Sequence, residues 1–220
     1  VACGNDWIAA TFRMLDSSIQ IDFRVADGDA IGAGEIWCVV SGPARSILTA
    51  ERTALNFAQL LSGTATVVRS MVAELEGTNA RLLDTRKTIP GLRLAQKYAV
   101  RCGGGSNHRV GLYDGILLKE NHIRSAGSIR RAVESALKAA DAVSLIEVEV
   151  ENLDELAEAL AAGAPRILLD NFSLDELRRA VSMTKGQAEL EASGNVTLET
   201  IREIALTGVD FISIGALTKH

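Results

Sequence analysis

The sequence predicts an α/β protein in which a small antiparallel sheet precedes a parallel sheet of repeated βα units, closed as a barrel or left open. Three observations support this prediction. Residues 1–50 alternate apolar and polar side chains, as in IQIDFRVADGDAI and EIWCVVSG, with turn residues between the runs. From residue 80 onward, short apolar runs alternate with helical patterns. The last three spacings between successive runs are 21 to 22 residues, which is close to the shortest βα unit.

One long helical pattern, SILTAERTALNFAQLLSGTATVVRSMVAELEG, lies between these two regions. Its apolar positions recur at helical spacing, and Ser62 and Gly63 predict a break near its middle. We therefore expect two domains. Residues 1–78 form an N-terminal sheet portion with helices, and residues 79–220 form the βα portion.

The βα portion is expected to hold six strands, each a short apolar run that leads into a polar or glycine position. These are Arg81–Thr85, Gly115–Lys119, Leu145–Val150, Arg166–Asp170, Ala188–Ala192 and Asp210–Ile214. Segments such as LDELAEALAAG and LDELRRAVSM supply the helices between them. Six strands are fewer than the eight of a TIM barrel, so a smaller or incomplete barrel is predicted.

Composition sets the broad class of the protein. The chain has 220 residues, of which 23% are charged and 47% hydrophobic, as in an ordinary globular protein. The sequence has no run of 18 apolar residues, so no membrane span is expected, and VACGNDWIAA lacks a signal-peptide pattern. Cys3, Cys38 and Cys102 are widely spaced, which is typical of reduced thiols in a cytoplasmic protein. Because the chain starts at Val1 and stops just after a strand-like run, we expect a fragment trimmed at both ends.

Positive charge is concentrated in one part of this acidic chain. Residues 81–130 contain ten Lys or Arg and three Asp or Glu, a net charge of +7, whereas the whole chain carries −5. A local positive field within an acidic molecule favours a small anionic ligand and argues against nucleic acid, which usually binds a basic domain or tail.

Polar residues at the ends of parallel strands predict a site. Barrel enzymes build their sites at this rim from the loops that follow the strands. The EVEVE run places Glu147, Glu149 and Glu151 on one face of a strand. An alternative is that strand ends are polar simply because they exit to solvent. Acids within otherwise apolar strands favour a functional site.

Glu149 and Asp170 are candidate metal ligands. Carboxylates that project from parallel strands are costly unless they are paired or metal-bound. Hard oxygen ligands in ones and twos suit Mg²⁺, which keeps several waters and shares a substrate phosphate. The alternative is a buried ion pair with Lys119 or Arg86.

Two glycine turns are candidate phosphate sites. SGNVT at residues 193–197 precedes a predicted helix, although Ser or Asn before a helix is also an ordinary cap. Gly215 and Ala216 follow the next strand, and adjacent glycine turns of this kind bind phosphate in many barrels. The sequence contains no GxxxxGK[ST], which excludes a P-loop. His108 follows three glycines and precedes Arg109, so we expect it to contact the ligand.

A set of motifs along the chain resembles bacterial quinolinate phosphoribosyltransferases. These motifs are ERTALNFAQLLSG, LLDTRKTIPGLRLAQKYAV, CGGGSNHRVGLYDGILLKENHI, EVEVEN, ILLDNF and GVDFISIGALTKH. The resemblance covers the chain almost end to end and in order. It implies an N-terminal open sandwich with helices, then a six- or seven-stranded α/β barrel, in chains that extend beyond both ends of this sequence.

The resemblance also implies an activity. The family joins quinolinate to phosphoribosyl pyrophosphate and releases nicotinate mononucleotide, pyrophosphate and CO₂, with Mg²⁺, as a homodimer. By resemblance, the quinolinate carboxylates are held by Arg86, Lys87, His108, Arg109 and Lys119, with Arg52 contributed across the dimer interface. Glu149 and Asp170 are expected to bind ribose hydroxyls and Mg²⁺, and Lys119, Glu149 and Asp170 to be catalytic. The 5′-phosphate is expected at Ser193, Gly194, Asn195, Gly215 and Ala216.

Three other functions are kept as alternatives. A related phosphoribosyltransferase would accept nicotinate or another ring in place of quinolinate. A barrel aldolase would use Lys119 as a Schiff base. An anion-sensing barrel would bind without turnover, but it would gain nothing from the acidic pair of Glu149 and Asp170.

Overall fold

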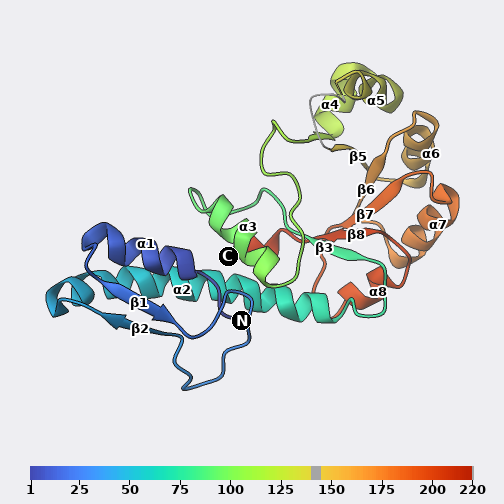
Figure 1. Cartoon of the computed structure of the whole chain (residues 1–220). Helices are drawn as coiled ribbons and strands as arrows, with labels where there is room; N and C mark the ends of the chain where they lie inside the picture. Colours follow the sequence, from blue (N-terminus) through green and yellow to red (C-terminus); the bar gives the residue numbers. More distant parts are fainter. Residues whose placement is uncertain (140–144, 220) are drawn as a thin grey trace. The chain divides into compact units, whose positions relative to one another are not determined.

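The computed structural model describes residues 1–139 and 145–219 (Figure 1). These residues form two compact units. The first contains Val1–Ser70 and Thr88–Gly105, together with the end of the chain from Leu217. The second contains Met71–Lys87 and Ser106–Ala216. The sequence-based domain boundary between residues 78 and 79 stays a prediction.

The first unit is built around a two-stranded antiparallel sheet, as predicted. Its elements are α1 (Asn5–Leu15), β1 (Gln20–Phe23), β2 (Cys38–Ser41), α2 (Ala44–Ala73, whose last turn belongs to the second unit), α3 (Arg93–Cys102) and α9 (Ala216–Lys219). Ile8 and Phe12 of α1 are buried together with Ala50 and Ala54 of α2. The sequence pattern of residues 1–50 predicts sheet and does not predict α1. The spacing of Ile8 and Phe12, which puts both on one face of a helix, is the signal for α1 that the strand prediction overlooked.

The long helix α2 shows no break at Ser62 and Gly63, so that prediction was wrong. Its buried stripe runs past this point, from Ala58 and Leu61 to Ala65. The Ser62 hydroxyl is occupied in a contact with another segment: it accepts from Cys3 N at 3.0 Å and donates to Cys3 O at 3.2 Å. Serine and glycine only weakly disfavour a helix, so tertiary packing can override them. Here the packing of the buried stripe keeps α2 helical through Ser62 and Gly63.

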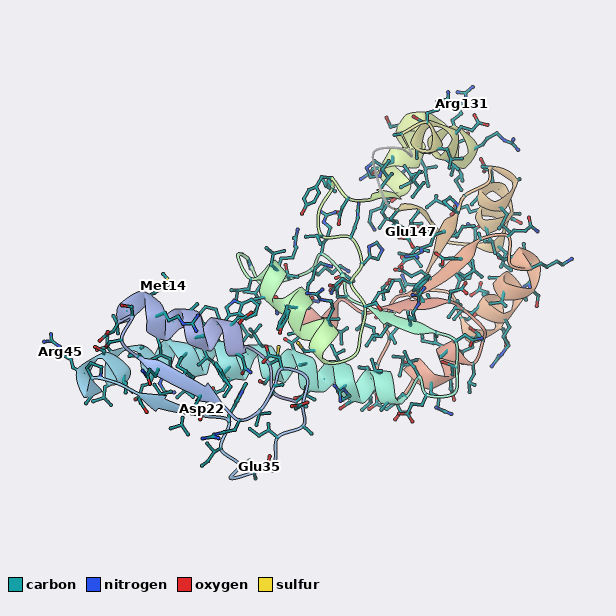
Figure 2. The ribbon with its side chains drawn as sticks, in the orientation of Figure 1. Met14, Asp22, Glu35, Arg45, Arg131 and Glu147 are labelled. Atoms are coloured by element: carbon teal, nitrogen blue, oxygen red, sulfur yellow. The ribbon has the colours of Figure 1, made fainter. Side chains whose placement is uncertain are left out.

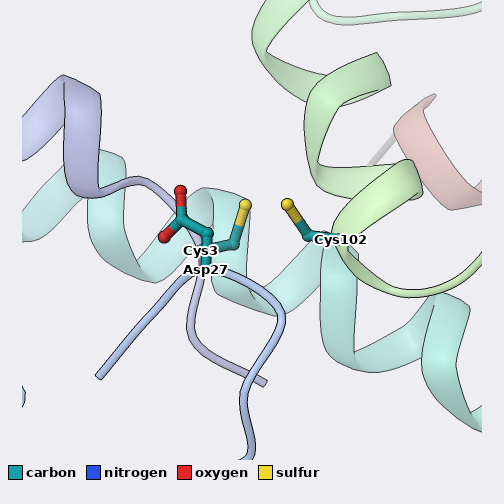
Figure 3. A group of neighbouring side chains, drawn as sticks. All are labelled: Cys3, Asp27 and Cys102. Carbon is teal, nitrogen blue, oxygen red and sulfur yellow. The ribbon is translucent and has the colours of Figure 1, made fainter.

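The start of α1 is fixed by Asp27. Its carboxylate accepts from Gly4 N at 2.9 Å and Asn5 N at 3.1 Å, and the Tyr98 hydroxyl donates to it at 2.8 Å. Cys3 lies beside Asp27, and its thiol faces that of Cys102 (Figure 3). All three cysteines lie in the described part of the chain and are free, as predicted. Burial raises the pKa of the Cys3 thiol, so it behaves as a packing group.

The second unit contains one six-stranded, all-parallel sheet. Its strands are β3 (Arg81–Leu83), β4 (Ile116–Leu118), β5 (Ile146–Val150), β6 (Arg166–Asp170), β7 (Glu189–Ser193) and β8 (Phe211–Ser213). The order is β3-β8-β7-β6-β5-β4, which is the order of successive strands around a barrel. Within residues 1–139 and 145–219, β3 and β4 do not pair with each other, and Ser106 bridges to Leu83 of β3 instead. The ring is therefore open at this edge.

Helices connect the strands, as expected for βα units. They are α4 (Glu120–Ala126), α5 (Ile129–Leu137), α6 (Leu153–Ala161), α7 (Leu174–Thr184) and α8 (Ile201–Ala205). Asn152 and Ser173 cap α6 and α7 by accepting backbone N–H groups, so each helix begins directly after its strand ends. No helix in the described residues is both long enough and apolar enough to cross a membrane.

The alternating pattern of β5 separates two environments. Val148 and Val150 are fully buried, while Glu147 and Glu149 point to the opposite face. Glu147 lies among the strands of the second unit (Figure 2). In the sheet register Glu149 pairs with Leu168, Leu168 with Glu191, and Asp170 with Ser193. One face of the sheet therefore carries rows of polar side chains instead of a uniform apolar core.

Candidate active site

A cavity of about 430 Å³ opens in the second unit near the carboxyl ends of the parallel strands. It is lined by Thr85, Arg86, Lys87, His108, Arg109, Leu117, Lys119, Glu149, Leu168, Asp170, Glu191, Ser193 and Ser213. Eight of these were singled out from the sequence, namely Arg86, Lys87, His108, Arg109, Lys119, Glu149, Asp170 and Ser193. The structure thus brings basic and acidic side chains from distant parts of the chain to one cavity.

The acidic rim of the cavity is formed by Glu149 and Asp170, at the ends of adjacent strands. Lys119 donates to Glu149 in an ion pair; the Lys119 side chain is 50% exposed and that of Glu149 is 17% exposed. The ion pair that we considered as an alternative is therefore present, although it lies at the surface. Asn171 Nδ2 donates to Asp170 Oδ2 at 2.8 Å. Two carboxylates on neighbouring strands, facing one cavity, are a donor set that fits Mg²⁺.

A basic wall is formed by the cationic side chains that line the cavity, namely Arg86, Lys87, Arg109 and Lys119. Arg109 donates to Gly115 O at 2.8 Å, which ties its guanidinium to the start of β4. Burial lowers the pKa of Arg109, and the positive charge of Arg86 lowers it further. Two guanidinium groups that repel each other in a partly dry place are stabilised by an anion that enters between them. This wall is therefore suited to carboxylate or phosphate groups.

His108 is held by the protein at both ring nitrogens. Arg109 N donates to Nδ1 at 2.7 Å, and Nε2 lies 2.9 Å from Glu147 Oε2. Because Nδ1 accepts a hydrogen bond, the ring proton is assigned to Nε2, which donates to Glu147. Both ring nitrogens thus have partners within the protein. A direct ligand contact by His108 stays a prediction.

Two buried glutamates, called the floor from here on, lie at the cavity: Glu191 is one of its lining residues, and Glu147 contacts the lining residue His108. Glu147 and Glu191 are both 0% exposed, and Glu191 Oε2 lies 3.5 Å from His108 Nε2. Burial raises the pKa of Glu147 to about 7. Burial, and then the charge of Glu147, raises the pKa of Glu191 to about 8. At neutral pH the pair therefore retains about one proton.

Sequence reasoning noted Glu147 within the EVEVE run but gave neither Glu147 nor Glu191 a role in the site. The signal was present in EVEVE and in LEAS, since a glutamate inside an apolar strand needs a reason. Asp84 was similarly left out. It is 0% exposed and accepts from Asn107 Nδ2 at 2.6 Å and His108 N at 2.9 Å. The bare LLD run therefore fixes the loop that carries His108.

The expected phosphate turns lie at the ends of β7 and β8. Gly194 has φ +108°, and a Cβ there would lie 2.1 Å from Asn171 Oδ1. Gly215 approaches Lys87, whose Cδ would lie 3.0 Å from an added Cβ. The lining of the cavity includes Ser193, but it does not include Gly194, Asn195, Gly215 or Ala216. The helix after SGNVT begins at Ile201, so its N-terminus does not follow the turn directly.

Arg52 differs from the other predicted residues because it belongs to the first unit. It lies on α2 and is exposed, whereas the cavity is formed by residues of the second unit alone. Its expected contribution across a dimer interface stays a prediction.

Comparison with known proteins identifies the family. Residues 1–62 match the family described as "Quinolinate phosphoribosyl transferase, N-terminal domain", and residues 64–220 match the corresponding C-terminal domain. A relative from Bacillus subtilis, named a probable nicotinate-nucleotide pyrophosphorylase (carboxylating), is 46% identical over 207 residues, which is 94% of this chain and 72% of the relative. A relative of the same name from Synechocystis is 43% identical over 98% of this chain and 74% of its own length.

A solved structure agrees with these relatives. The nicotinate-nucleotide pyrophosphorylase from Francisella tularensis has 54% sequence identity and a TM-score of 0.96, over 100% of this chain and 78% of that chain. The family match spans both parts of the chain, and eight of the residues that the resemblance singled out in the second unit line one cavity. The chain belongs to the quinolinate phosphoribosyltransferase family.

Proposed function

We propose that this protein transfers the phosphoribosyl group of phosphoribosyl pyrophosphate to quinolinate and removes one carboxyl group as CO₂. The products are nicotinate mononucleotide and pyrophosphate. The observation that best supports this proposal is the meeting of Arg86 and Arg109 with Glu149 and Asp170 around one cavity. A dicarboxylate needs the cations, and a sugar with hydroxyl groups needs the acids.

The basic wall is proposed to bind quinolinate. Its two carboxylates match the fork geometry of Arg86 and Arg109, and Lys87 and Lys119 add point charges. Since Arg109 is already partly desolvated, its attraction for a carboxylate exceeds that of a surface arginine. The wall therefore orients the ring, and it presents the ring nitrogen to the sugar.

The acidic rim is proposed to bind the ribose and a magnesium ion. Glu149 and Asp170 would hold Mg²⁺, as the donor set allows, and share it with the pyrophosphate group. Bound there, the ion would supply positive charge that stabilises the departing pyrophosphate. Ser193, Gly194, Asn195, Gly215 and Ala216 are proposed to hold the 5′-phosphate, which would anchor the sugar at the opposite end.

The chemistry requires positioning and charge stabilisation. The bond from ribose C1 to the pyrophosphate oxygen breaks, and its electron pair leaves with pyrophosphate. Glu149 and Asp170 stabilise the positive charge that develops on the sugar, and the basic wall keeps the ring nitrogen within reach of C1. The lone pair of that nitrogen then forms the new bond. The ring becomes cationic, and the neighbouring C–CO₂ bond breaks with its electron pair kept on the ring carbon, which takes up a proton.

A homodimer is part of this proposal. In it, Arg52 on α2 of one protomer would reach the site of its partner and add a further cation for quinolinate. The exposed position of Arg52 is compatible with this role.

The proposal is tested by a product assay with two substrates. Purified protein is incubated with phosphoribosyl pyrophosphate, Mg²⁺ and either quinolinate labelled in the carboxyl next to the ring nitrogen or nicotinate. We expect labelled CO₂ and nicotinate mononucleotide from quinolinate only, and a loss of about 10²-fold or more for Arg109→Ala. Product from nicotinate, or unchanged activity of the variant, would contradict the proposal. Reductive trapping of a carbonyl substrate on Lys119 would instead indicate an aldolase.

A further inference from the structure

The floor holds more buried carboxylate oxygens than its neighbours satisfy with regular hydrogen bonds. Glu147 Oε1 and both oxygens of Glu191 have no hydrogen-bond partner at ordinary geometry among the described residues. Such atoms are costly when buried, and native proteins keep few of them. Neither glutamate belongs to the basic wall or the acidic rim, so their retention under the cavity needs another explanation.

The contact that both glutamates share is His108. Glu147 lies on β5 and Glu191 on β7, and their carboxyl groups approach the same nitrogen, His108 Nε2, at 2.9 and 3.5 Å. The sheet holds both strands firmly. His108, in contrast, lies in the irregular segment between α3 and β4. Through His108, the two glutamates therefore connect this segment to strands β5 and β7 of the sheet.

The other ring nitrogen, Nδ1, accepts a hydrogen bond from the backbone N–H of Arg109. His108 Nδ1 can accept the Arg109 N–H only while the ring proton is on Nε2. A carboxylate acceptor at Nε2 keeps the proton there. Arg109 is thereby held at its backbone by His108 and at its guanidinium by Gly115 O. These two contacts determine where its side chain enters the cavity.

We propose that Glu147 and Glu191 are positioning residues: they fix the ring proton and orientation of His108, and through it the placement of Arg109 against a ring carboxylate. This inference rests on the proposed function, because it assumes that Arg109 binds quinolinate. It gives the glutamates a selective role. They affect the binding of the dicarboxylate, while phosphoribosyl pyrophosphate is held at the rim and at the glycine turns.

The test uses glutamine substitutions in the full chain. Glu147→Gln and Glu191→Gln keep the shape of the side chain and replace its carboxyl group with an amide. A glutamine amide can donate to Nε2 and so allow the ring proton to move to Nδ1. We expect KM for quinolinate to rise about tenfold or more, with KM for phosphoribosyl pyrophosphate within about twofold. Glu189→Gln is the matched control, since Glu189 lies on the same strand as Glu191 but its side chain is 49% exposed and pairs with Arg166.

Two measurements need no turnover. Calorimetry gives quinolinate affinity directly, and ¹⁵N spectra of the three histidines report the tautomer of His108. We expect an Nε2–H ring in the parent chain and in Glu189→Gln, and an altered ring in Glu147→Gln. An unchanged tautomer and unchanged quinolinate affinity in both folded floor variants would overturn the inference, as would an equal rise in both KM values. If the parent chain forms no nicotinate mononucleotide, the proposed function fails, and the tautomer measurement still tests the anchoring of His108.

Discussion

The floor and the rim of the cavity both use glutamate from β5, but the floor glutamate is buried and the rim glutamate is partly exposed. Glu147 and Glu149 lie two residues apart on β5 and face the same way, yet Glu147 is 0% exposed and Glu149 meets solvent and Lys119. Burial raises the pKa of Glu147 to about 7. Depth within the strand, more than residue type, therefore separates a group suited to holding a neighbour from one suited to binding a charged ligand.

The largest expected effect on activity is at the rim. Asp170→Asn keeps the size of the side chain and removes its charge, so we expect kcat/KM to fall about 10²–10³-fold, or roughly 2.7–4 kcal/mol of transition-state stabilisation. Its free energy of unfolding is expected to stay within about 0.5 kcal/mol of the parent, because the site is close to the surface. Steady-state kinetics and urea unfolding measure the two quantities. If Asp170→Asn lowered the free energy of unfolding by more than it lowered transition-state stabilisation, Asp170 would be a structural residue and not a ligand-binding one.

The backbone of the glycine turn after β7 is expected to matter next. Gly194→Ala places a Cβ at φ +108° and 2.1 Å from Asn171 Oδ1, so we expect a loss of about 1–3 kcal/mol of stability and weaker binding of phosphoribosyl pyrophosphate. Gly163→Ala is the matched control: its φ is +76° and nothing lies within 4 Å of an added Cβ. Thermal unfolding and the KM for phosphoribosyl pyrophosphate are measured for both variants and compared. Equal losses would show that backbone conformation alone, and not the Asn171 contact, sets the cost.

Prediction from the sequence succeeded for the parallel strands, where a short apolar run was enough to locate each strand. The Arg166–Asp170 strand was predicted at its observed bounds, and the other parallel strands were displaced by one or two residues at their ends. The break at Ser62 was wrong because a contact from Cys3, distant in sequence, occupies its hydroxyl. A local pattern contains no information about such a partner.

Depth was also invisible in the sequence. A period of two put Glu147 and Glu149 on one face correctly, but it could not say which one is covered. That depends on register, in which Glu147 pairs with Arg166 and Glu149 with Leu168. His108 shows the same limit, because its sequence neighbours suggested a ligand contact while its ring reaches Glu147 on another strand. Eight of the residues that line the cavity were predicted from the sequence, but which residues support the others was not.

At the floor, the expected effect is on stability and depends on pH. The pKa of Glu191 is raised from 4.5 to about 8 by burial and by Glu147, so the folded state keeps a proton that the unfolded state loses. Stability from this group is complete below about pH 4.5 and declines as pH rises towards 8. Relative to Glu191→Gln, the parent chain is expected to lose up to about 1.4 kcal/mol per pH unit across this window.

Urea unfolding at several pH values between 5 and 8 measures this slope, with Glu189→Gln as the control that follows the parent. The groups facing Glu191 are Glu147, His108 and Ser213. If the parent and Glu191→Gln curves run parallel, His108 compensates the charge of the pair as a full cation, and the floor is an ion pair like the rim.

The smallest expected effect is the contribution of the rim ion pair to stability. Lys119 is half exposed, so solvent and salt screen its attraction to Glu149. A double-mutant cycle with Lys119→Met and Glu149→Gln should therefore give a coupling energy below about 1 kcal/mol in urea unfolding, and less still at high salt. Both single variants should nevertheless lose activity, because the same two groups face the cavity. A coupling of several kcal/mol that resisted salt would place Lys119 and Glu149 in the same dry environment as Glu147, and depth along β5 would no longer explain why these strand neighbours differ.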